Sequence, residues 1–223
     1  VVWWWPQGGT TLSAGEVGMG YKEVNDPAIT LRFRDADDPD LSYLAWTTTP
    51  WTLISNVALA VAEKVDYAFC DDPDGGTVVV AKDLAGSFGL VPKFTKKGSE
   101  LVGRSYVPLY DFGPVEGGKS FVIVEGHHVT TSAGTGIVHT APAFGEDDMM
   151  VAKKQGLGVL QWVLPNGCFA KNTGFVAGLF CKDADRLIIK NLEERKIIFK
   201  RETIRHEYPF CWRADDDPLI QYA

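Results

Sequence analysis

Residues 134–148 read GTGIVHTAPAFGEDD, and this stretch carries three structural signals in succession. Gly136 to His139 is a short β-branched run that predicts a strand. Pro142 and Gly145 predict a loop directly after it. Asp147 and Asp148 then suit the positive end of a helix dipole, so we expect a helix to begin near Glu146. A strand that ends in a loop often holds a binding site, which makes this segment a candidate.

The rest of the chain shows short apolar runs bounded by Gly, Pro and Asp, and few helical patterns. Asp74-Gly75-Gly76 predicts a turn between two strands. We expect further strands at Leu41–Trp46, Asp66–Cys70, Thr77–Ala81, Ser120–Glu125 and Val159–Leu164. We expect helices at Leu84–Phe88 and at Asp183–Lys196, where Asp183 caps a face formed by Ala184, Leu187, Ile188 and Leu192. The expected fold is a β-rich α/β domain, with a closed or nearly closed β-barrel core and short peripheral helices.

Composition limits the classes of function. With 223 residues, 45% of them hydrophobic, the chain has enough apolar material for one sizeable core. No apolar run is long enough to span a bilayer. The net charge of −7 argues against a protein that grips nucleic acid alone, so an RNA substrate would be held only by a short end. Four dispersed cysteines form no C-x-x-C pair, which predicts free thiols: Cys70, Cys168, Cys181 and Cys211.

A second motif lies at residues 46–52, which read WTTTPWT. Its proline ends a strand abruptly, and such a bend presents hydroxyls and backbone N–H groups to a ligand. The simpler interpretations are an ordinary threonine-rich edge strand, a satisfied core histidine at His139, and a helix-dipole role for Asp147 and Asp148. The residues alone therefore support only a candidate polar site.

Together the two motifs resemble the editing domain of class I aminoacyl-tRNA synthetases, the insertion called connective peptide 1. The WTTTPWT form is typical of isoleucyl enzymes, because valyl and leucyl relatives usually have Arg and an acidic residue where this chain has Thr49 and Trp51. Similarity continues through residues 9–13, 21–27 and 208–213. The resemblance implies one editing domain over 1–223, cut from a larger synthetase. Its core is expected at about 28–203, with 1–27 and 204–223 as arms to the absent catalytic domain.

The resemblance also implies roles for individual residues. Asp148 matches the carboxylate that binds the α-ammonium group of the substrate. Other matching positions line the pocket for the terminal adenosine and the amino acid: Thr47, Thr48, Thr49, Thr52, Trp51, His139 and Tyr208. Trp51 and Tyr208 are bulky enough to exclude isoleucine. No general base is identified.

The implied reaction is hydrolysis of valine from mischarged Val-tRNA(Ile), with valyl adenylate as an alternative substrate, in the cytoplasm. The implied partners are the 3′ end of tRNA(Ile) and the rest of the synthetase, with no membrane. The editing domain needs no cofactor, whereas ATP and Mg belong to the parent catalytic domain, whose signatures are absent from this chain.

Zinc is a separate question. Family members often bind zinc through two C-x-x-C pairs, which align here with Trp5 and Gly8 and with Cys211 and Ala214, so we predict no metal.

Two alternatives remain open. One is the editing domain of a valyl- or leucyl-type synthetase, against which the residues around Pro50 argue. The other is a degenerate, non-catalytic RNA-contacting insert, against which Asp148 and the intact threonine run argue.

Overall fold

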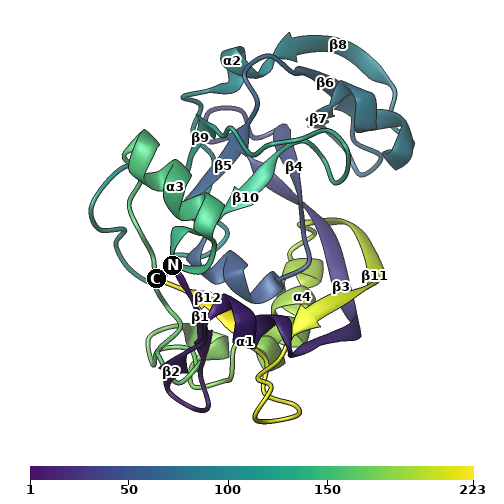
Figure 1. Ribbon diagram of the computed structural model, residues 1–223. Helices are drawn as coiled ribbons and strands as arrows, with labels where there is room; N and C mark the ends of the chain where they lie inside the picture. Colours follow the sequence, from purple (N-terminus) through teal and green to yellow (C-terminus); the bar gives the residue numbers. More distant parts are fainter.

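The largest sheet has six strands in the order β11-β3-β4-β7-β6-β8, in a computed structural model that describes residues 1–223. All neighbours are antiparallel except β4 and β7. Figure 1 shows β6, β7 and β8 at one end and the long β3 and β11 at the other. The strands are β3 (Tyr21–Arg34), β4 (Leu41–Thr47), β6 (Asp66–Asp71), β7 (Thr77–Ala81), β8 (Pro92–Lys97) and β11 (Ile198–Pro209).

A second sheet has the order β10-β5-β9 and packs against the first. It consists of β5 (Ala58–Val61), β9 (Val122–Glu125) and β10 (Val138–Thr140). Side chains from both sheets meet in the main core, which includes Leu31, Tyr43, Leu59 and Ile123. Helix α3 (Glu146–Gln155) covers the second sheet through Val151 and Ala152. The order of strand, loop and acidic helix start predicted for residues 134–148 is confirmed, but the strand predicted at Gly136–His139 lies at Val138–Thr140.

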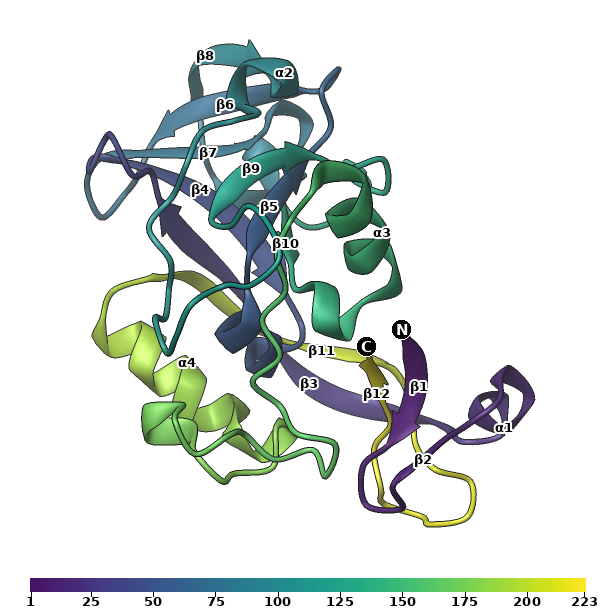
Figure 2. The same ribbon diagram turned by 90° about the vertical axis from the view of Figure 1, so that its left-hand side faces the viewer.

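The two ends of the chain form a third, small sheet, β12-β1-β2, with Val2 paired to Tyr222. Its strands are β1 (Val2–Trp5), β2 (Thr10–Thr11) and β12 (Ile220–Tyr222), and α1 (Ala14–Gly18) follows β2. Figure 2 shows both termini side by side at this sheet. Residues 1–27 and 204–223 thus pair with each other, because the outer halves of β3 and β11 also pair, from Asp26↔Ile204 to Tyr21↔Pro209.

The remaining helices are short. They are α2 (Gly98–Leu101), α4 (Asp185–Glu194) and the 3₁₀ helices η1 (Pro50–Ser55), η2 (Lys82–Phe88), η3 (Pro142–Phe144), η4 (Gly174–Val176) and η5 (Lys182–Ala184). None of the helices is both long and apolar enough to cross a membrane.

Three expectations need correction. The barrel is not confirmed, because β11 and β8 are unpaired edges of the six-stranded sheet. Val159–Leu164 makes only isolated bridges, since its partners at Glu116 and Phe169 belong to irregular segments. The helix expected over Asp183–Lys196 is divided between η5 and α4, and Leu187 is 43% exposed while Ile189 is buried.

The turn at Asp74-Gly75-Gly76 is confirmed. Gly76 has a φ of 81°, and a Cβ there would lie 2.6 Å from the Asp40 carbonyl oxygen. Both the left-handed backbone and the close approach require glycine. This turn joins β6 to β7 and so sets the register between these two strands of the six-stranded sheet.

Candidate functional site

The site lies where the large sheet opens. Strand β4 pairs with β7 only over Leu41–Tyr43, whereas it continues beside β3 as far as Thr47. The free edge of its last residues therefore faces the segment that leads into β10. A cavity of about 360 Å³ occupies this opening. Its lining comes from three segments: Trp46, Thr47 and Thr48; His128 and Thr130; and Ala133, Gly134, Thr135, Gly136, Ile137 and Val138.

The threonine run is held by its own hydroxyls. Thr47 Oγ1 accepts the Thr49 N–H at 3.1 Å, and the Thr49 carbonyl accepts the Thr52 N–H at 3.0 Å to begin η1. Pro50 stands at the first position of η1, where its missing N–H costs no hydrogen bond. Only the Thr48 hydroxyl makes no hydrogen bond within the protein, and Thr48 lines the cavity. Thr48 therefore presents a free donor and acceptor to a ligand.

His139 is buried, and its tautomer follows from its partners. Asn56 Nδ2 donates to the Ala58 carbonyl at 3.0 Å and to His139 Nδ1 at 2.8 Å. His139 Nδ1 must then accept, so the proton lies on Nε2, which donates to Thr52 Oγ1 at 3.0 Å. Burial lowers the pKa of His139 to about 3. A neutral imidazole with both nitrogens engaged orients the threonine bend but is a poor general base.

Asp148 lies in the first turn of α3, and its carboxylate folds back to accept the Ala141 N–H at 2.8 Å. Gly145 makes room for it, because a Cβ there would lie 3.0 Å from the carboxylate carbon. Burial raises the pKa of Asp148, while the hydrogen bond from the Ala141 N–H opposes that rise. The carboxylate is thus partly desolvated and suited to pair with a cation.

Two residues of this region were not predicted from the sequence. His128 lines the cavity, and both of its ring nitrogens are buried without a hydrogen-bond partner. Asn56 links His139 to the Tyr106 hydroxyl, which donates to Asn56 Oδ1. The only signals in the sequence are two polar residues, Ser55 and Asn56, inside the apolar run at 53–61, and a histidine pair shortly before Gly134.

Trp51 does not line the cavity. Its side chain is 3% exposed and packs edge-on against Phe144 in the main core, with ring centroids 5.0 Å apart. The Trp51 N–H donates to Asp185 Oδ1 at 2.8 Å, so its backbone is tied to α4. Burial raises the pKa of Asp185 to about 7. Trp51 therefore anchors the residues after the threonine bend to α4 and to the main core.

Tyr208 also lies away from the cavity. Its hydroxyl donates to the Leu219 carbonyl at 2.6 Å, and Lys182 Nζ stands 3.5 Å from its ring centroid. Of the predicted site residues, Thr47 and Thr48 line this cavity. Hydrogen bonds connect Thr49, Thr52 and His139 to them in series. Asp148 bonds to Ala141, two residues after His139, whereas Trp51 and Tyr208 lie away from the cavity.

The residues at the zinc-binding positions do not fit a metal. The ring of Trp5 covers Gly8, where a Cβ would lie 2.1 Å from it, and Trp5 Nε1 donates to Asp217 Oδ2 at 2.8 Å. Cys211 is buried in a small apolar cluster with Leu12 and Leu219. An aromatic ring and an apolar cluster occupy the space that four ligands would need.

Comparison with solved structures defines the fold. The editing domain of the cytosolic leucyl-tRNA synthetase of P. knowlesi superposes with a TM-score of 0.62, at 11% identity over 86% of this chain and 99% of that chain. The fold is therefore that of a synthetase editing domain.

Sequence relatives define the family, although no family model matches the chain. The isoleucine–tRNA ligase of Clostridium kluyveri is 43% identical over 94% of this chain, and that of Thermoplasma acidophilum is 40% identical over the whole of this chain. The chain belongs to the isoleucyl-tRNA synthetase family and corresponds to its editing domain. It spans about a fifth of the length of these relatives, 20% and 22%.

Proposed function

We propose that the chain hydrolyses the ester between valine and the 3′ end of tRNA(Ile). The observation that carries the proposal is the cavity at the sheet opening. There the free Thr48 hydroxyl and the unpartnered His128 ring line one space, and Val138 of β10 lines it too. The Asp148 carboxylate is held on the loop that follows β10, at the Ala141 N–H. An aminoacyl ester has polar oxygens that hydroxyl groups can bind and an ammonium group that a carboxylate can bind.

In this proposal Asp148 binds the α-ammonium group of the aminoacyl ester. The incoming cation compensates for the water that the half-buried carboxylate has lost, so binding favours the ionised form of Asp148. The hydroxyls of Thr47, Thr48 and Thr49 hold the terminal adenosine, with Thr52 and His139 fixing the geometry of the bend. The ammonium contact then orients the ester carbonyl toward the threonine bend.

Hydrolysis proceeds by attack of water oxygen on the ester carbonyl carbon. The developing oxyanion is stabilised at Thr48, because the N–H groups of Thr49, Trp51 and Thr52 already donate within the protein. The C–O bond to the ribose then breaks, the ribose oxygen takes a proton, and free valine leaves. His139 is neutral, and both of its ring nitrogens are already hydrogen-bonded. We therefore assign activation of the water to the neighbouring ribose hydroxyl of the substrate and not to a protein base.

Preference for valine over isoleucine requires a steric limit, because one methylene changes attraction too little for a single pocket; this general limit is known from isoleucyl enzymes themselves. Trp51 and Tyr208 do not line the cavity, so we assign Trp51 an indirect part. Its indole packs against Phe144 in the main core and so anchors the η1 turn that follows the threonine run. The arms at 1–27 and 204–223 are proposed to join the rest of the ligase, which uses ATP and Mg to charge tRNA in the cytoplasm.

The test is deacylation of Val-tRNA(Ile) and Ile-tRNA(Ile) by the purified chain. We expect rapid loss of valine and slow loss of isoleucine. Preferred hydrolysis of mischarged tRNA(Val) or tRNA(Leu) would assign the domain to a sister enzyme. Binding of tRNA without release of any amino acid would identify a non-catalytic RNA-contacting insert instead.

A further inference from the structure

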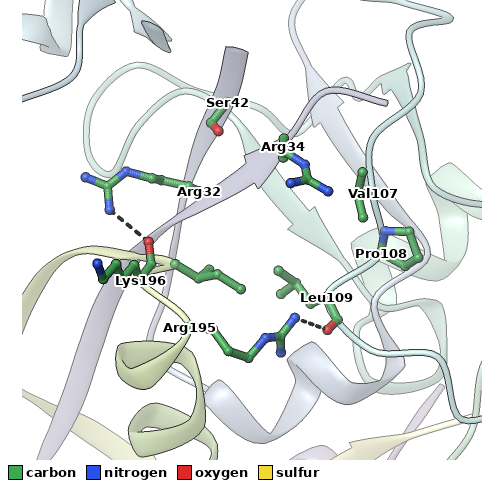
Figure 3. Close-up of a pocket in the computed structure, with 9 residues that line it drawn as sticks. Arg32, Arg34, Ser42, Val107, Pro108, Leu109, Arg195 and Lys196 are labelled. Carbon is green, nitrogen blue, oxygen red and sulfur yellow. Dashed lines mark hydrogen bonds between the residues drawn. The ribbon is translucent and has the colours of Figure 1, made fainter. Parts of the chain in front are cut away.

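A second cavity, of about 350 Å³, lies at the far end of β3 and β4 from Thr48 and is rich in basic side chains. Its nine lining residues include four basic and no acidic ones: Arg32, Arg34, Ser42, Val107, Pro108, Leu109, Arg195, Lys196 and Ile197. Figure 3 shows Arg34 entering from β3 and Arg195 from the end of α4, with Leu109 between them. A chain with a net charge of −7 thus concentrates positive charge at one place.

The charge of Arg32 is already balanced. Its guanidinium forms a bidentate ion pair with Asp72, at 2.6 and 2.9 Å, and a third bond of 2.8 Å to Asp74. It also donates to the Lys196 carbonyl at 3.4 Å (Figure 3). Arg32 therefore ties the β6–β7 turn to the loop after α4 and leaves no charge for a ligand.

The other three cations have no acidic partner. Arg195 is held by neutral groups, since it donates to the Leu109 carbonyl at 2.7 Å and to Asn191 Oδ1 at 3.1 Å. Tyr110 supports the same guanidinium from 5.1 Å. Arg34 and Lys196 are exposed and make no ion pair. Like charges held around one space without a carboxylate repel each other, and an anion relieves that repulsion.

We propose that this basic cavity, defined by Arg34, Arg195 and Lys196, binds backbone phosphates of the tRNA whose 3′ end enters the cavity at Thr48. The inference rests on the proposed function for the identity of the RNA. Ser42 lines the basic cavity and Thr48 the other one, and six residues of extended chain span ~20 Å. That is less than one turn of a double helix, ~34 Å. A tRNA that reaches Thr48 has phosphates within that range.

The test measures binding of uncharged tRNA(Ile) to the chain by fluorescence anisotropy at several salt concentrations. Arg34→Gln removes one free cation, and Lys64→Gln is the matched control. Lys64 is an exposed residue without an ion pair, at the opposite end of β6 from the Asp72–Gly76 turn beside this cavity. Loss of one phosphate contact is expected to weaken binding about five- to eightfold at 0.1 M salt and to lower the salt slope by about 0.7–0.9. Lys64→Gln is expected to change neither, and kcat for deacylation is expected to stay unchanged in both variants.

Several results would overturn the inference. If the two variants weaken tRNA binding equally, the effect comes only from the net charge of the chain. If Arg34→Gln does not change tRNA binding, RNA does not contact this cavity. Stabilisation by inorganic phosphate that Arg34→Gln abolishes, with unchanged tRNA binding, would reveal a free-phosphate pocket instead. A chain that hydrolyses Val-tRNA(Ile) while Arg34→Gln binds normally refutes only this inference. Arg34-dependent binding without hydrolysis refutes only the proposed reaction.

Discussion

The carboxylate of Asp148 accepts the N–H of Ala141 at 2.8 Å, so the residue proposed to bind the substrate ammonium also closes the loop between β10 and α3. A substitution at Asp148 therefore tests two roles at once. The comparison of an amide with a methyl group at this position separates them, because an amide oxygen can still accept the N–H.

We predict that Asp148→Asn and Asp148→Ala both abolish clearance of Val-tRNA(Ile), since neither carries the charge that pairs with the ammonium group. Asp148→Asn should keep nearly the wild-type melting temperature. Asp148→Ala should lose about 1–3 kcal/mol, because the Ala141 N–H is left without an acceptor. Asp147→Asn, at an exposed neighbouring position, is the control. Wild-type deacylation by Asp148→Asn would disprove the assignment.

Thr48 and Thr52 should respond differently to alanine. Thr48→Ala is expected to lower the deacylation rate at least tenfold with little change in stability, because its hydroxyl is free in the protein. Thr52→Ala should lower the free energy of unfolding by about 1–3 kcal/mol, because the His139 Nε2–H loses its acceptor. Urea unfolding and deacylation kinetics on both variants provide the check. A Thr48→Ala variant that is destabilised but fully active would reverse the two roles.

Trp51→Ala is predicted to destabilise the chain by about 3–5 kcal/mol, because it removes a 3% exposed indole from the main core. Trp51→Phe should retain much of the packing against Phe144 and remain folded. The measurements are thermal unfolding and hydrolysis of Ile-tRNA(Ile). If Trp51→Ala stays folded and begins to hydrolyse Ile-tRNA(Ile), the indole forms the wall of the amino-acid pocket directly.

Stability should depend on pH through the half-buried Asp185 and the buried His139, whose pKa shifts have opposite directions. Burial raises the pKa of Asp185 from 3.8 to about 7, so its ionisation makes the folded state lose stability as pH rises through this range. Burial lowers the pKa of His139 from 6.5 to about 3, so stability is lost as pH falls through that range. Asp185→Asn should remove the first effect. The difference in stability between Asp185→Asn and the wild type should grow in favour of the variant from about pH 4 to pH 7, where it amounts to several degrees in Tm. A pH-independent difference would contradict the assignment.

Metal analysis of the purified chain is predicted to find no stoichiometric zinc, because Trp5 and the apolar surroundings of Cys211 fill the place of the ligands. Zinc at one equivalent that survives dialysis against a weak chelator would show that other residues form a site. His206, which bonds Asp26 at 2.8 Å, would be the first to examine.

The sequence by itself determined which short segments carry the chemistry. Residues 46–52 and 134–148 place hydroxyls, a histidine and acidic residues at strand ends, and this local order survives in the structure. Most strands were predictable for the same reason, since alternation and turn residues act over a few positions. The strand predicted at Val159–Leu164 is wrong, because an apolar run forms a strand only where the edge of another strand is available to pair with it.

Only the tertiary structure decided which way these side chains turn and what they meet. It buried Trp51 in the core, engaged both nitrogens of His139, and brought His128 to the cavity wall from outside either motif. It also opened the sheet beyond Tyr43 and set Arg34 opposite Arg195. These outcomes depend on pairing between segments far apart in the chain. Local propensity does not specify such pairing, because burial and hydrogen bonding are satisfied only when the whole core assembles.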